Sequence, residues 1–164
     1  MKKDRLEELF TSDLRYVINM EKQIIKALTK ISKAAVLPEL KQIFDEQLKQ
    51  GSDHINRVES MFDDIGQKSR GIKSKGLEGI VQESAELIDK SGKLEPDVLD
   101  AALIATVQRI QQYKIAAYKT LRIYSRFLES QYSSALLDKT LDEESLIYSK
   151  LTRVLTNRVN PKTK

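Results

Sequence analysis

Apolar positions recur at steps of three and four residues along four long segments of the chain, the spacing that places side chains on one face of an α-helix. These segments run from about 4 to 33, 38 to 65, 96 to 128 and 134 to 158. Pro38 and Pro96 open the second and third segments, where a helix tolerates proline. One of the paired serines Ser133 and Ser134 is expected to cap the fourth. The pattern predicts an all-α protein with four long helices.

Residues 66–95 form one long connection between the second and third helices. Five glycines punctuate it, and a short amphipathic helix is indicated inside it by the spacing of Leu77, Ile80, Val81, Ser84 and Ile88. The other two connections are short. A four-helix bundle with one long crossover has the ferritin-like connection. We expect a single domain over residues 1–164, with a flexible C-terminal tail at 159–164.

Each of the four helical stripes is apolar at both ends and polar near its middle. Burial of an unpaired polar group is costly, so polar groups at similar depth on four helices are expected to meet. The sequence therefore predicts one central polar cluster made of Glu21, Gln47, Gln50, His54, Gln111, Lys114 and Glu144.

Di-metal carboxylate bundles have a related layout, with one Glu on each of two helices and Glu-x-x-His on each of the other two. Such metals need anionic oxygen ligands. Here the second helix offers Gln50 and Asp53, with His54 one place later, and the third offers Gln111 and Lys114. An ammonium group has no lone pair and repels a metal ion. The pattern departs from a di-metal site.

Composition narrows the possible functions. The 164 residues carry a net charge of +4, with acidic and basic side chains interleaved, and include no Cys and one His. Apolar runs are far shorter than the ~20 residues of a membrane span, and no signal-peptide pattern is present. The basic ends are too small for strong binding to nucleic acid at physiological salt. We expect a cytoplasmic protein that binds neither membrane nor nucleic acid.

Three segments carry a resemblance to a known family: MEKQIIKALTKISKAA, QRIQQYKIAAYKTL and LDEESL. In this order they resemble the YciE/YciF family of bacterial ferritin-like proteins, over about residues 4–155. The resemblance implies a ferritin-like four-helix fold, often dimeric, and an association with bacterial stress responses. It brings no established reaction. The family commonly has acidic residues where this chain has Gln50, Gln111 and Lys114, whereas Glu21 and Glu144 match.

These observations lead to the hypothesis that Lys114 supplies the positive charge that metal ions supply in related bundles. Its ammonium would lie between Glu21 and Glu144, with hydrogen bonds completed by Gln47, Gln50, Gln111 and His54. No metal cofactor is expected. We also expect that the protein is not an enzyme. The sequence has no phosphate-binding loop, and with no Cys and one His it has few residues that could form a nucleophile–base pair.

Two other functions stay open on the sequence. One is a metal-binding, ferroxidase-like protein that holds iron, manganese or zinc on Glu21, Asp53, His54 and Glu144. The other is a helical module that binds a protein or DNA, through a dimer face or a basic end. Individual side chains also have ordinary interpretations. Lys114 could extend its ammonium to solvent, and Glu21 could lie on the surface. Two of the acids Asp142, Glu143 and Glu144 are expected to be surface residues.

Overall fold

The computed structural model describes residues 2–159, and in this range every regular element is helical. The four long helices are α1 (Lys3–Ala34), α2 (Pro38–Asp64), α4 (Pro96–Phe127) and α5 (Gln131–Val159). The crossover carries the short helix α3 (Lys75–Asp89) and a 3-10 turn at Ser91–Lys93. The predicted all-α architecture, with a short extra helix in the crossover, is confirmed.

The largest difference from the predicted boundaries is at the start of α5, which begins at residue 131 instead of about 134. The Oγ of Ser130 accepts a hydrogen bond from the amide of Ser133 at 3.2 Å. Ser130 therefore caps the helix, and the expectation that Ser133 or Ser134 does so is wrong. Val159 is still helical, and the rest of the expected tail, residues 160–164, lies outside the described residues.

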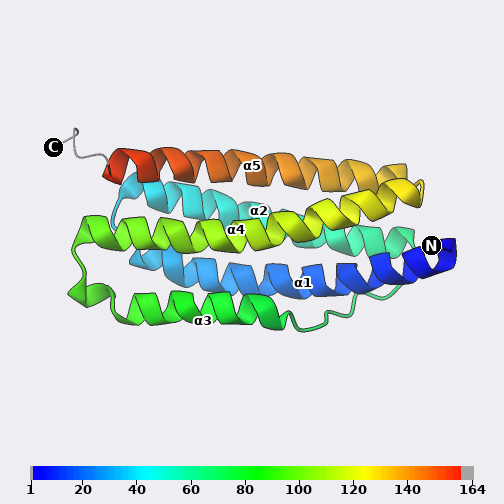
Figure 1. Ribbon diagram of the computed structural model, residues 1–164, viewed down its shortest axis with the longest axis horizontal. Coiled ribbons are helices and arrows are strands. Elements are labelled where there is room, and N and C mark those ends of the chain that lie inside the picture. The colour runs from blue at the N-terminus through cyan, green and yellow to red at the C-terminus, as the bar shows by residue number, and fades with distance from the viewer. Residues whose placement is uncertain (1, 160–164) are drawn as a thin grey trace.

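The helices form an elongated bundle in which α1 and α2 make one hairpin and α4 and α5 make another (Figure 1). The crossover runs along the length of the bundle, and α3 lies on the outside against α1 and α4 (Figure 1). This short, long, short order of connections is the ferritin-like order. No helix between residues 2 and 159 combines the length and apolar character needed to cross a lipid bilayer.

Asp100 on α4 fixes the turn between α1 and α2. This fully buried carboxylate accepts hydrogen bonds from the amides of Val36 and Leu37, at 2.8 and 2.9 Å. Leu37 is the cap residue of α2, so Asp100 satisfies amides that the helix itself leaves unpaired. The contact ties one end of the first hairpin to the second.

The apolar stripes predicted on the four long helices form the core, with large side chains such as Phe44, Phe62 and Tyr118 fully buried. The polar residues in the middle of these stripes are buried along with them, and Glu21, His54, Gln111, Lys114 and Glu144 are each no more than 1% exposed. The fold thus places titratable groups from four helices inside the bundle.

Candidate functional site

The ammonium of Lys114 lies at the centre of the bundle, in contact with groups from three other helices. Its Nζ is 2.7 Å from Oε1 of Glu144, 3.0 Å from Oε1 of Glu21 and 2.9 Å from Nδ1 of His54. An ammonium has three N–H donors, and three acceptors surround it here. Lys114 does not extend to solvent, and Glu21 does not lie on the surface.

His54 extends this centre toward the edge of the bundle. Because Nδ1 accepts from Lys114, the ring proton belongs on Nε2, which donates to Oε2 of Glu143 at 2.8 Å. Arg57 holds the same carboxylate with two hydrogen bonds, of 2.6 and 2.8 Å. The side chains of Glu143 and Arg57 are 23% and 12% exposed. A continuous chain of polar contacts therefore joins Lys114 to the boundary between α2 and α5.

Tyr118 closes the other side of the centre. Its hydroxyl donates a 2.6 Å hydrogen bond to Oε1 of Glu21. Its ring meets the ring of His54 edge to face, with centroids 6.0 Å apart. Tyr118 is fully buried, so its hydroxyl has no contact with bulk water. The hydroxyl instead helps to fix Glu21.

The surroundings of these groups keep the ion pair charged. Burial by itself would lower the pKa of Lys114, but the charges and hydrogen bonds of Glu144 and Glu21 outweigh it and raise this pKa. Burial would likewise raise the pKa of Glu21, yet the charge of Lys114 and the hydrogen bond from Tyr118 lower it. The pKa of the Tyr118 hydroxyl is raised well above its usual value by burial and by Glu21.

The outer carboxylate is also stabilised in its charged form. Burial tends to raise the pKa of Glu143, but hydrogen bonds from Arg57 and His54 prevail and lower it to about 2. The hydrogen bond to Glu143 in turn raises the pKa of Arg57. The bidentate Arg57–Glu143 pair is a strong form of ion pair, and it positions the carboxylate that orients His54.

The glutamines predicted for the cluster take different places. The Nε2 atom of Gln111 makes only long contacts, 3.4 Å to Oε2 and 3.5 Å to the backbone oxygen of Glu144. Within residues 2–159, neither side-chain polar atom of Gln47 has a hydrogen-bond partner, and Oε1 of Gln50 has none. The expectation that Gln47 completes the hydrogen bonds of the centre is wrong. Asp53 is exposed and does not join the cluster.

This donor set does not fit a di-metal centre. In such bundles the inward carboxylates surround the cations, whereas here the oxygens of Glu21 and Glu144 are 3.0 and 2.7 Å from an ammonium. The amide side chains of Gln50 and Gln111 are weaker ligands than carboxylates, since they carry no charge. Among the described residues, no three side chains of His, Asp or Glu are arranged to hold one metal ion.

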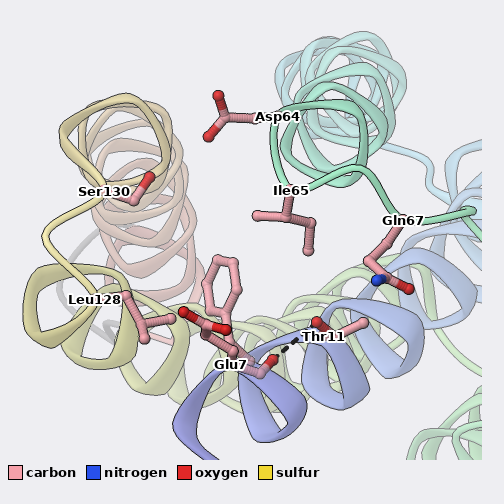
Figure 2. A pocket seen from close by; sticks show the side chains of 8 residues that line it. Glu7, Thr11, Asp64, Ile65, Gln67, Leu128 and Ser130 are labelled. Carbon is pink, nitrogen blue, oxygen red and sulfur yellow. Dashed lines mark hydrogen bonds between the residues drawn. The ribbon is translucent and has the colours of Figure 1, made fainter. Parts of the chain in front are cut away.

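A separate pocket of about 290 Å³ opens at the end of the bundle where α1 begins and α2 ends. Figure 2 shows Ile65 pointing into it, with Asp64 and Ser130 at its rim. It is lined by Glu7, Phe10, Thr11, Asp64, Ile65, Gln67, Leu128 and Ser130. None of these residues belongs to the predicted polar cluster, and no histidine, lysine or thiol is among them. The buried centre, and not this pocket, is therefore the candidate site.

Sequence reasoning missed two members of the network, Arg57 and Glu143. Glu143 was expected on the surface as part of an acidic run. Arg57 lies three residues after His54 on α2, so both sit on neighbouring positions of one helix face. This spacing is the signal that could have placed Arg57 beside the cluster.

Comparison with known proteins gives consistent matches over the whole length of the chain. Residues 5–164 match the family model described as a domain of unknown function, DUF892. Protein YciF of Escherichia coli K12 is 34% identical over 158 residues, covering 96% of this chain and 94% of YciF.

Two solved structures are also similar. The crystal structure of YciF, named as an E. coli stress protein, superposes with a TM-score of 0.89 at 32% identity and covers 95% of this chain and 98% of that one. YcfI of Rhodopseudomonas palustris, named as a candidate structural protein, gives a TM-score of 0.82 at 30% identity, with 90% and 92% covered.

Proposed function

This chain belongs to the DUF892 family and is similar to YciF, which is named as a stress protein. We propose that it is a stress-associated bacterial protein without enzymatic activity. In this proposal the di-metal site of ferritin-like bundles has been replaced by a buried ion-pair network around Lys114. The observation that carries it is the position of the Lys114 ammonium between Glu21 and Glu144. The association with stress is supported by the name of YciF.

The chemistry of the centre supports a structural role. Catalysis by a metal needs an open coordination position or a bound water, and an ammonium fixed to α4 offers neither. Acceptor atoms from three other helices lie within 3.0 Å of its nitrogen. The centre therefore has the features of an internal electrostatic link between four helices, and its proposed function is to hold the bundle together.

Elemental analysis of the purified chain tests this proposal. The protein is expressed, analysed for iron, manganese and zinc, then incubated with each ion without oxygen, desalted and analysed again. We expect well below one ion per chain in every sample. A stable content of one or two ions per chain, together with oxidation of Fe²⁺ faster than in buffer, would replace the proposal with the ferroxidase-like alternative.

We further propose that the chain forms a homodimer, in the cytoplasm, through the groove between α1 and α4. α3 occupies one half of this groove (Figure 1). Beyond the end of α3 the groove continues as a hollow of about 320 Å³ lined by Tyr16, Met20 and Tyr113. Tyr16 is 44% exposed, Tyr113 38%, and Phe127, two heptads after Tyr113 on α4, 75%. An apolar groove that already accepts one helix suits a helix of a second copy.

Sedimentation velocity of matched variants tests the dimer. Tyr16→Arg places a charge in the groove and is expected to shift the protein to monomers. Tyr132→Arg is the control, because Tyr132 is 49% exposed on α5 and does not line the groove. A wild-type protein that is monomeric at micromolar concentration would refute this part of the proposal and leave the Lys114 network untouched.

A further inference from the structure

Beside the Lys114 centre lies a group of buried polar atoms that have no hydrogen-bond partner in the described chain. They are Oε2 of Glu21, Oε1 and Nε2 of Gln47, and the Oε1 atoms of Gln50, Gln111 and Glu144. Glu21, Gln47 and Gln111 are each no more than 1% exposed. Buried polar atoms in native proteins are nearly always paired with protein, water or an ion. Five of these six atoms are oxygens. Oε1 of Glu144 is 2.7 Å from the Lys114 ammonium, so the other four oxygens are the ones that lack a hydrogen-bond donor or a cation.

The helix registers place Gln50 and Gln111 about one turn, and Gln47 about two turns, from the contact between His54 and Lys114. Gln50 lies one turn before His54 on α2, and Gln47 about one turn earlier. Between them and His54 is Gly51, where an added Cβ would come 3.9 Å from Oε2 of Glu21 and 3.1 Å from Cγ1 of Ile25. The backbone of α2 therefore runs next to the free oxygen of Glu21. On α4, Gln111 lies one turn before Lys114.

The charges of the centre do not balance. Glu21 and Glu144 contribute two negative charges and Lys114 one positive charge, all inside the bundle. Arg57 and Glu143 neutralise each other at its edge. Only one hydrogen can lie between Nζ of Lys114 and Nδ1 of His54, which are 2.9 Å apart, so these two side chains together carry one positive charge. One negative charge is left in a place where an uncompensated charge is costly.

We propose that a single monovalent cation of the Na⁺, K⁺ or NH₄⁺ class binds beside Lys114, between Oε2 of Glu21 and the amide oxygens of Gln47, Gln50 and Gln111. This inference rests on the proposed function, because it requires Lys114 to remain as the first positive charge. One more positive charge neutralises the interior. A divalent ion would exceed this charge, stand next to an ammonium, and find one carboxylate oxygen where such ions favour several.

Thermal unfolding of the full chain in different chloride salts tests the site. Melting temperatures are compared in NaCl, KCl, NH₄Cl and choline chloride at equal ionic strength and neutral pH, with choline as a cation too large for a buried site. At a concentration about thirty times the Kd, binding multiplies the ratio of folded to unfolded chain by about thirty. In a chain of this size the melting temperature then rises by about 4–8 °C. Equal melting temperatures in all four salts would overturn the inference.

Two variants assign the effect to this site. Gln47→Leu removes two of the unpaired atoms at similar volume and is expected to fold and to lose most of the difference between salts. Gln112→Leu is the matched control, since Gln112 is exposed on α4, and it should keep the difference. A Gln47→Leu variant that retains the full difference would contradict the assignment.

A direct measurement on the wild type adds to the unfolding data. The ²³Na resonance should broaden in the presence of the protein and sharpen again when the preferred competing cation is added. Failure of these salt experiments removes the monovalent site but leaves the Lys114 ion pair in place. By contrast, stoichiometric iron, manganese or zinc in the elemental analysis would remove the proposed function itself.

Discussion

Replacement of Lys114 by methionine is the sharpest test of the buried ion pair. Methionine has nearly the length and volume of lysine but no charge, so Lys114→Met removes the ammonium while it keeps the packing of α4. The carboxylates of Glu21 and Glu144, which now share the ammonium at 3.0 and 2.7 Å, would face each other without a counter-charge. Nδ1 of His54 would lose its donor as well.

The expected loss of stability is large. Removal of one partner from a buried ion pair typically costs about 3–5 kcal/mol, because the remaining charge stays buried and unpaired. For a chain of this size each kcal/mol lowers the melting temperature by about 2–4 °C, so the whole effect corresponds to about 6–20 °C. The control is Lys119→Met, one residue beyond Tyr118 on the exposed side of α4, which should change stability by less than about 0.5 kcal/mol.

Urea and thermal unfolding at neutral pH measure both variants against the wild type. Two additional conditions separate charge from packing. The penalty in Lys114→Met should shrink as the pH falls, because unpaired buried carboxylates become protonated readily. Added Mn²⁺ or Zn²⁺ should stabilise this variant but not the wild type, since only the variant lacks the central charge. A Lys114→Met protein as stable as Lys119→Met at neutral pH would refute the reasoning.

Three further results are expected. Folding lowers the pKa of Glu143 from 4.5 to about 2, so on acidification the unfolded chain takes up this proton before the folded chain does. The free energy of unfolding should therefore fall by about 1–2 kcal/mol between about pH 5 and pH 2. Glu143→Gln should lack this part of the acid sensitivity in pH-dependent urea titrations. Tyr118→Phe should cost about 1–3 kcal/mol in urea unfolding, because it removes the hydroxyl that donates to Glu21 at 2.6 Å. Asp100→Ala should cost about 1–3 kcal/mol, because two amides at the start of α2 lose their acceptor, and hydrogen exchange should rise in that turn.

Much of the fold follows from the sequence because the pattern of apolar residues is local. Steps of three and four residues identify four helices, and their buried stripes are the ones the pattern indicates. The predicted start of α5 was wrong because three serines lie in one short segment and each of them can cap a helix. The sequence does not show which of the three does so. The role of Asp100 was invisible for another reason. Its partners lie 64 and 63 residues away along the chain, and no local pattern joins them.

The periodicity of the helices also predicted the residues at the centre of the site, but it did not predict those at its edge. Glu21, Lys114 and Glu144 lie on the buried stripes, so register alone brought them to the interior. Glu143 is one position off its stripe, and whether such a residue turns inward depends on the rotation of α5 and on a partner such as Arg57. For Gln47 the sequence predicted the position but not the contacts. Its burial was predictable, but its lack of hydrogen bonds depends on distances that periodicity does not contain.

The proposed exchange of metal ions for a lysine would have consequences beyond the loss of two cations. Two divalent ions carry four positive charges and one ammonium carries one, so carboxylates that suit a metal centre become too many for a lysine. The neutral side chains of Gln50 and Gln111 answer this need, since each stands where the resemblance to ferritin-like relatives implies an acid. A return of either residue to glutamate with Lys114 in place would add a second uncompensated charge to the interior. In the proposed exchange, Lys114 and these two glutamines therefore belong together, because loss of the metal charge requires loss of the acids.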